Sequence, residues 1–410
     1  MLVNDNRSYR LSLGSKTVSV SKAFSNDAKE MDTNGNGYLD NHEVAAAVLG
    51  DSVSLNQTEG QDLVQEFKSR MAGLPNPNAE GYHSFQQMEK EIFELAKAHP
   101  EEVQLKSLGK TSEGRDIWAL KISEGAQGNT SHKTGLVVTG CHHAREWMTV
   151  EAPLKLVHDI LDNKSTPENQ NRLKEAELWV IPIVNPDGYE FTRNENSWWR
   201  KNRRPLEVDQ NGKPTSAVGV DLNRNYWDGN PEHMYVYRPP GDTPGNTRDD
   251  FSATSDNPRS DTYRGPFGGS EPEVKALLDL ELSNPNIRGV LDYHSYGDTI
   301  LYPYGHTRQE SPNAALYKEI GKKMQNASYG WDLEQSVGLY PASGTSDDTH
   351  DLNGILNFTI EMGRSFQPNP RTIPETTERV SKSSLAFIDE MITKDDQGLL
   401  PPRLVSDRSA

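Results

Sequence analysis

Cysteine is almost absent from this sequence, because Cys141 is the only one among 410 residues. A single thiol excludes an internal disulfide, so the fold must depend on its hydrophobic core and on any metal that it binds. One thiol fits a reducing compartment without establishing one.

Long apolar runs are also missing. No stretch approaches the roughly 20 apolar residues that a membrane-spanning helix needs, and residues 1–20 lack the apolar centre of a secretory signal. We therefore expect no membrane association, and either no export by that route or a leader outside the printed chain. The localisation is left open.

Positive charge is scarce relative to negative charge. The chain has 43 Lys and Arg against 60 Asp and Glu, for a formal net charge of -17. This excess repels phosphate backbones and anionic lipids. We therefore expect neither nucleic acid nor a membrane as a partner.

A Pro/Asn/Gly-rich stretch at 73–78 is typical of a linker between independently folded parts. We place a small N-terminal module at 1–75, a linker at 76–80 and a large domain at 81–394. Upstream of the linker the pattern shows short helices and no convincing strand. The tail at 395–410 is expected to be disordered.

The large domain alternates between strand and helix patterns, which favours an α/β fold with a mixed central sheet flanked by helices. Capping boxes are predicted at Ser84 with Gln87 and at Ser270 with Glu273. The Gly/Pro/Asp-rich segment 238–269 is typical of a functional loop. The predicted strands are 103–108, 117–122, 136–139, 178–184, 287–293 and 355–360, and the predicted helices are one that begins after Ser84 and 150–161, 271–282, 313–324 and 377–392.

A twelve-residue loop at 32–43 carries oxygen-bearing residues in the spacing of a calcium site, with Gly37 at the sharp turn and Glu43 at the closing position. The loop resembles an EF-hand, so the first module is predicted to be EF-hand-like and to bind one Ca²⁺. The alternative is a plain Asn/Gly/Asp turn. Because no second loop of this kind is present, a structural clip is favoured over a switch. The predicted ligands are Asp32, Asn34, Asn36, Tyr38 (through its carbonyl), Asp40 and Glu43.

Histidines follow two of the predicted strands. His143 and Glu146 come after 136–139, and His294 comes directly after an apolar run at 290–293. Side chains at the carboxyl ends of parallel strands meet at one edge of a sheet, and three such ligands leave a fourth position for water, as catalytic zinc requires. A lone histidine at a strand end is more often structural. Spacing alone does not choose between His142 and His143.

Further motifs stand in order along the chain: 140–147 (GCHHAREW), 185–189 (NPDGY), 199–203 (WRKNR), 219–225 (GVDLNRN) and 292–296 (DYHSY), with 301–305 (LYPYG) and 359–361 (TIE) in addition. The first five resemble the ordered signature of zinc carboxypeptidases of the pancreatic A/B type, and the similarity runs from about residue 82 to 392. This resemblance implies that His143, Glu146 and His294 bind zinc, and that Asp221 accepts the free ring N–H of His143.

The same resemblance implies roles for the remaining site residues. Glu361 matches the glutamate that takes a proton from the attacking water and passes it to the leaving amine. Arg200 matches the arginine that stabilises the oxyanion. Asn223 and Arg224 match the pair that holds the terminal carboxylate of the substrate, Tyr340 matches the tyrosine that closes over the bound residue, and Arg145 resembles part of the neighbouring subsite.

Asp347 falls where B-type enzymes carry the aspartate that pairs with a basic side chain, which implies a preference for C-terminal Lys or Arg. Asp348 beside it is interpreted as structural. Two departures stand out: the A/B-type activation domain is not recognisable, and residues 362–365 are unlike the pancreatic pattern.

These patterns together predict a monomeric, zinc-dependent metallocarboxypeptidase that acts on the C-termini of peptides or proteins, with one Zn²⁺ and one Ca²⁺. Two alternatives stay open. One is a cell-wall peptide carboxypeptidase, although Asn223, Arg224 and Tyr340 suit an ordinary peptide terminus. The other is a calcium-regulated binding protein whose peptidase domain is inactive.

Overall fold

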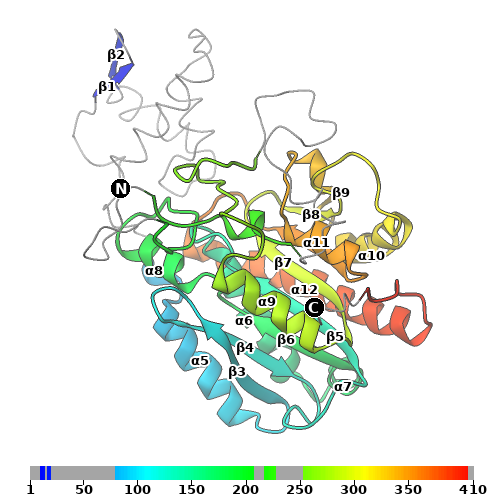
Figure 1. Cartoon of the computed structure of the whole chain (residues 1–410). Helices are drawn as coiled ribbons and strands as arrows, with labels where there is room; N and C mark the ends of the chain where they lie inside the picture. Colours follow the sequence, from blue (N-terminus) through cyan, green and yellow to red (C-terminus); the bar gives the residue numbers. More distant parts are fainter. Residues whose placement is uncertain (1–9, 14–15, 20–78, 207–216, 228–252, 405–410) are drawn as a thin grey trace.

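The computed structural model in Figure 1 describes residues 10–13, 16–19, 79–206, 217–227 and 253–404. The predicted calcium loop at 32–43 lies outside these residues, as does the 238–252 part of the predicted functional loop. Within the described ranges, no helix is both long and apolar enough to cross a membrane.

An eight-stranded mixed sheet organises the large domain. Its middle strands pair in parallel and its outer strands include antiparallel pairs. All six predicted strands are confirmed, and the two that were missed have only four residues each, too few for a period to show. In spatial order the strands are β3 (Val103–Lys110), β4 (Asp116–Ile122), β6 (Ala176–Ile181), β5 (Thr134–Gly140), β7 (Ile287–His294), β10 (Leu356–Glu361), β8 (Thr299–Tyr302) and β9 (Asp332–Gln335).

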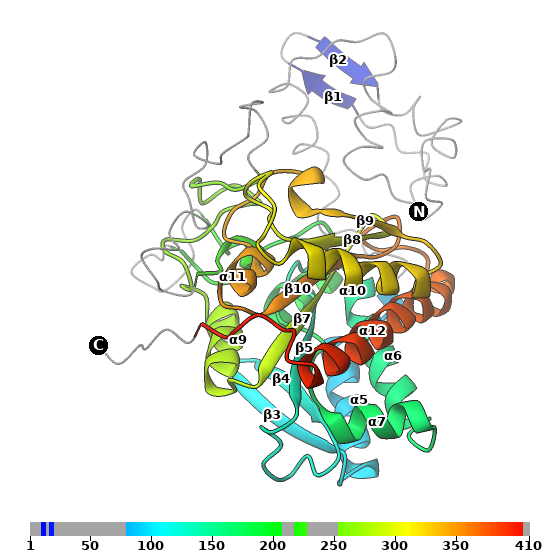
Figure 2. The ribbon, with the colours of Figure 1, turned by 90° about the vertical axis from the view of Figure 1, so that its right-hand side faces the viewer.

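Helices cover both faces of the sheet, which explains why every residue of β5, β6 and β10 is buried. Figure 2 shows α9 on one side and α6 and α12 on the other. The two core clusters correspond to these two faces. The helices are α5 (Phe85–Ala98), α6 (Met148–Leu161), α7 (Pro167–Glu175), α8 (Pro186–Asn194), α9 (Pro272–Ser283), α10 (Ala314–Ala327), α11 (Ser346–Leu352) and α12 (Ile373–Asp396).

The two predicted capping boxes have different outcomes. Ser84 and Gln87 form the reciprocal pair at the start of α5, which confirms the first. The second is wrong, because Glu271 is the N-cap of α9 and makes no side-chain cap bond. Ser270 Oγ instead donates to Glu271 Oε1. Glu273 Oε2 accepts a hydrogen bond from Asn202 Nδ2 at 3.1 Å.

Two further predictions need correction. A two-stranded antiparallel hairpin, β1 (Arg10–Leu13) with β2 (Lys16–Ser19), stands where no strand was expected, because four-residue strands leave too short a pattern to detect. The segment after α12 is not disordered as far as residue 404. Arg403 Nη2 donates to the Glu281 carbonyl and the Leu404 amide donates to the Asn353 carbonyl, so this backbone is held against the domain.

The centre of the sheet supplies a test of the fold. Phe358 in β10 is fully buried against Tyr317 and Phe387, at ring-centroid distances of 5.1 and 5.8 Å. Phe358→Ala is expected to lower the free energy of unfolding by about 3–5 kcal/mol, because it removes this packing and leaves a cavity. Chemical denaturation followed by circular dichroism measures the change. Leu399→Ala, at a side chain that is 55% exposed, is the control and should stay within about 0.5 kcal/mol of the parent.

Candidate active site

The carboxyl ends of three adjacent parallel strands bring the predicted site residues together. In the pairing of β5 with β7, Gly140 lies opposite Tyr293, and in the pairing of β7 with β10, His294 lies opposite Glu361. The turn after β5 then carries His143 and Glu146 to the same edge. Residues separated by more than 200 positions therefore share one site.

His143, Glu146 and His294 are buried and point their ligand atoms at one another. His143 Nδ1 lies 2.8 Å from Glu146 Oε1, and His294 Nδ1 lies 3.1 Å from Glu146 Oε2 and 3.0 Å from His143 Nδ1. Two imidazole nitrogens that converge with one carboxylate form a donor set that zinc prefers. The residues therefore fit a zinc ion.

Asp221 holds the far side of His143. Its Oδ1 lies 3.1 Å from His143 Nε2, and its Oδ2 accepts a bond from Arg200 Nε at 2.8 Å. Although burial acts in the opposite direction, Arg200 and His143 keep the pKa of Asp221 well below its usual range. A carboxylate at Nε2 directs the ring proton there and leaves Nδ1 free for a metal.

His142 points the other way. Its Nε2 lies 2.6 Å from the Tyr226 hydroxyl, and its Nδ1 lies 2.9 Å from Asp292 Oδ1. His142, Asp292 and His294 also lie close enough to hold a metal, so the described residues contain two candidate clusters that share His294. Sequence reasoning considered His142 but missed Asp292, although Asp292 stands only two positions before His294.

Glu361 ends β10 in a buried position beside the triad. Burial and the charge of Glu146 raise the pKa of Glu361, while His294 and Arg200 lower it, and the net result is a pKa of about 8. A cation held by the triad would lower the pKa of Glu361 further and favour its charged form.

Glu361 lines a cavity together with the residues predicted to bind substrate. The other lining residues are Asn223, Arg224, Leu301, Gly305, Ser336, Leu339, Tyr340, Ala342, Thr345, Asp347 and Thr359. The predicted base, carboxylate clamp and specificity residue thus share one space.

Two arginines present different surroundings. Arg200 is buried, and its Nη2 has no hydrogen-bond partner among the described residues, which leaves a donor for an incoming oxygen. Arg224 donates from Nε to the Ala253 carbonyl at 2.5 Å and from Nη1 to the Asn223 carbonyl at 2.6 Å. Its guanidinium lies 5.7 Å from the Tyr340 ring, which is 37% exposed at the rim.

Asp347 is a buried carboxylate that forms no ion pair with any described residue. It accepts a bond from Ser336 Oγ at 2.6 Å and from the Asp348 amide at 3.0 Å. Burial and the neighbouring charge of Asp348 raise the pKa of Asp347 to about 6. Asp348 differs because it accepts from the Gly305 and His306 amides at 2.7 and 3.0 Å, which accords with a structural role.

Arg145 lies outside this cavity. Its guanidinium stacks 4.3 Å from the Phe366 ring, and Nη1 lies 3.2 Å from the Trp198 carbonyl and 3.6 Å from Asp261. The Arg145 side chain is itself buried. Phe366 carried no signal in the sequence that would have placed it here.

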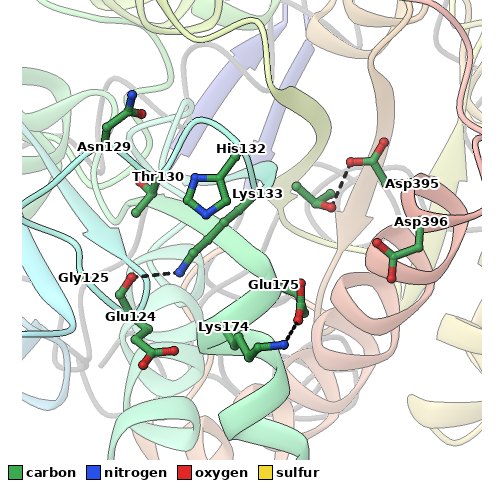
Figure 3. Close-up of a pocket in the computed structure, with 11 residues that line it drawn as sticks. Glu124, Gly125, Asn129, Thr130, His132, Lys133, Lys174, Glu175, Asp395 and Asp396 are labelled. Carbon is green, nitrogen blue, oxygen red and sulfur yellow. Dashed lines mark hydrogen bonds and ion pairs between the residues drawn. The ribbon is translucent and has the colours of Figure 1, made fainter.

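The open cavity in Figure 3 is larger, at about 730 Å³, but lies elsewhere. It is lined by the start of β5 at Thr134 and the end of α12 at Asp395, which is the amino-end edge of the parallel strands. Lys133 Nζ in this cavity donates hydrogen bonds to the carbonyls of Glu124 and Leu173. Ligands of α/β sheets bind at the opposite edge, where the triad lies.

Comparison with known proteins decides which family has this arrangement. The family model described as zinc carboxypeptidase matches residues 88–383. The chain belongs to the zinc carboxypeptidase family. It is accordingly a metallocarboxypeptidase, a hydrolase of peptide bonds, and the family together with the His-Glu-His triad supports zinc as its metal.

Individual relatives agree with this assignment. The metallocarboxypeptidase is 28% identical to carboxypeptidase A1 of Rattus norvegicus over 370 residues, covering 87% of this chain and 81% of the relative. It is 30% identical to carboxypeptidase A4 of Mus musculus over 325 residues, covering 77% and 70%.

Solved structures extend the comparison to the fold. The carboxypeptidase A structure from Helicoverpa armigera matches with a TM-score of 0.62 and 26% identity, covering 75% of this chain and 74% of that one. Bovine thrombin-activatable fibrinolysis inhibitor, solved with a tick carboxypeptidase inhibitor, matches with a TM-score of 0.63 and 24% identity, covering 77% and 99%. The predicted α/β fold with a mixed sheet flanked by helices is therefore confirmed as zinc carboxypeptidase-like.

Proposed function

We propose that this metallocarboxypeptidase removes single residues from peptide or protein C-termini, preferring Lys or Arg. The observation that carries the proposal is the cavity beside the triad, which brings Glu361, Arg224 and Asp347 together. Such a reaction requires a base for the attacking water, a cation for the terminal carboxylate and an acid for the basic side chain of the substrate.

His143, Glu146 and His294 are the residues that would hold the zinc. When bound, zinc supplies a Lewis acid and lowers the pKa of a coordinated water towards roughly 7. Asp221 keeps His143 in the tautomer that offers Nδ1.

Glu361 and Arg200 carry the chemical step. Glu361 takes a proton from the attacking water and delivers it to the leaving amine, so no covalent intermediate with the chain is needed. Arg200 directs its unpaired Nη2 at the oxyanion that develops on the former carbonyl. The bond from Arg200 Nε to Asp221 fixes the guanidinium before substrate arrives.

Asn223 and Arg224 restrict the reaction to chain ends. Both line the cavity beyond Glu361, where a terminal carboxylate would neutralise the guanidinium. An internal peptide segment would leave Arg224 without its anion. Tyr340 at the rim covers the bound residue.

Asp347 supports the preference for basic residues, because a buried carboxylate without a cation is costly and a Lys or Arg side chain would supply one. A large apolar side chain would leave that charge unpaired. We further propose that the N-terminal module binds one Ca²⁺ as a structural clip, and that the enzyme is a monomer. Asn223, Arg224 and Tyr340 argue against the cell-wall alternative, because they suit an ordinary peptide terminus, and the activity of the zinc-loaded wild type decides the inactive-domain alternative.

Glu361→Gln tests the assignment of the base. The amide cannot accept the water proton, so kcat is expected to fall by at least about 10²-fold while the zinc content stays at one per chain. Peptide hydrolysis and elemental analysis measure the two quantities on one preparation. Full activity in Glu361→Gln would contradict the assignment, whereas an inactive wild type that contains zinc would favour the binding-protein alternative.

Asp347→Asn tests the preference for Lys and Arg. The kcat/KM for peptides ending in Arg is expected to fall by roughly 30-fold or more relative to peptides ending in Phe. This factor corresponds to a loss of about 2 kcal/mol of transition-state stabilisation. In the wild type, the same kcat/KM should decline as the pH falls through about 6, because Asp347 is charged only above its raised pKa.

Asp348→Asn is the matched control, since Asp348 is engaged by backbone amides. It should change the stability and leave the ratio of Arg to Phe rates intact. A wild type that prefers Phe to Arg would contradict the role given to Asp347.

Glu43→Gln tests the calcium clip. Removing one oxygen of the closing ligand is expected to weaken Ca²⁺ binding, measured by isothermal titration calorimetry. If the site is a clip, a calcium-selective chelator with zinc supplied should lower the Tm and leave kcat/KM unchanged. A change in kcat/KM without a change in Tm would identify a switch instead.

A further inference from the structure

Asp292 and His142 form a buried polar pair directly behind His294 that the proposed mechanism does not use. Both side chains are fully buried. The His142 ring stacks on the His294 ring with centroids 5.6 Å apart and an interplanar angle of 23°. A buried carboxylate and a buried imidazole destabilise the fold unless they are paired or hydrogen-bonded, so their partners indicate their role.

The ring nitrogens of His294 indicate the role of Asp292. Its Nδ1 belongs to the triad, so Nε2 carries the ring proton and needs an acceptor. Two described side-chain atoms lie near Nε2: Asn223 Nδ2 at 3.2 Å and Asp292 Oδ2 at 3.2 Å. Asn223 Oδ1 already accepts from the Ser346 amide at 2.8 Å, so its Nδ2 is a donor. Asp292 Oδ2, at ion-pair distance, is therefore the acceptor available to the His294 ring proton.

Asp292 is itself held in place from several sides. Thr139 Oγ1 donates to Oδ1 at 2.9 Å, and Ser346 Oγ donates to Oδ2 at 2.5 Å. The Tyr226 hydroxyl lies 2.6 Å from His142 Nε2, and as a donor it leaves the His142 proton on Nδ1, 2.9 Å from Asp292 Oδ1. The contact of Tyr226 with His142 and the ion pairs of Asp292 with His142 and His294 thus connect Tyr226 to His294, although His142 Nδ1 forms no aligned hydrogen bond with a described residue.

We propose that Asp292 is a positioning residue for His294, and that His142 and Tyr226 hold Asp292 in turn. The inference rests on the zinc site of the proposed function. Asp292 would do for His294 what Asp221 does for His143: hold the ring N–H, set the tautomer and orient the nitrogen that faces the metal. The cluster of His142, Asp292 and His294 is then the support of the zinc site and not a second metal site.

The test measures zinc affinity by competition with a chelator, using the full chain, in wild type, Asp292→Asn, Tyr226→Phe and Asp351→Asn. Asp292→Asn is expected to weaken zinc binding by about 10- to 100-fold. Tyr226→Phe keeps the ring volume and should weaken binding by less, below about tenfold. The visible spectrum of the cobalt-substituted protein should shift in Asp292→Asn, because the orientation of His294 changes.

Asp351→Asn is the matched control. Asp351 is also buried, and it accepts bonds only from neutral side chains, Ser311 Oγ at 2.8 Å and Asn313 Nδ2 at 2.9 Å among the described residues. The zinc affinity of the Asp351→Asn variant should equal that of the wild type. This comparison separates a role at the metal from the general effect of removing a buried charge.

Each other outcome counts against the inference. Wild-type affinity in both Asp292→Asn and Tyr226→Phe overturns it, and if Asp292→Asn does not fold, unchanged affinity in Tyr226→Phe alone overturns it. Two zinc ions per wild-type chain, with one lost in Asp292→Asn, would make the cluster a metal site. A wild type that binds no zinc overturns the proposed function first, and the inference with it.

Discussion

The parallel register of β5, β7 and β10 is the constraint on which the rest of this structure depends. Gly140 lies opposite Tyr293, and His294 lies opposite Glu361, so three separate parts of the chain end at one edge of the sheet. Because side chains alternate between faces along a strand, a shift of one residue would turn His294 or Glu361 away. The buried core on both faces holds that register.

Buried charge is the cost of this arrangement. Asp221, Arg200, Glu146 and Asp292 all lie inside the domain, where an unpaired ion would be strongly destabilising. Each has a partner: Arg200 with Asp221, Asp221 with His143, Glu146 with His143 and His294, and Asp292 with His142 and His294. Asp347 differs because its described hydrogen-bond partners are a hydroxyl and a backbone amide. This environment suits its proposed role of pairing with a cation from the substrate.

The sequence predicted the sheet well because its central strands carry short apolar runs or alternating apolar residues. It did not predict the hairpin of β1 and β2, whose four-residue strands are too short to show a period. The capping box at Ser270 failed because tertiary contacts with Asn202 overrode a local pattern. Residues 397–404 were expected to be part of a disordered tail, but the domain surface supplies partners for this segment.

The site was predicted unevenly for a physical reason. Spacing placed His143, Glu146 and His294 at strand ends, but left His142 open because two adjacent residues differ only in which way they point. Asp292, Phe366 and Ser336 act through contacts between distant segments, which no local pattern reveals.

Anomalous diffraction at the zinc edge, from crystals of the zinc-loaded protein, tests the central claim most directly. The account predicts one peak, about 2.0–2.2 Å from His143 Nδ1, His294 Nδ1 and a Glu146 carboxylate oxygen. A peak between His142, Asp292 and His294, or no peak at the triad, would contradict it.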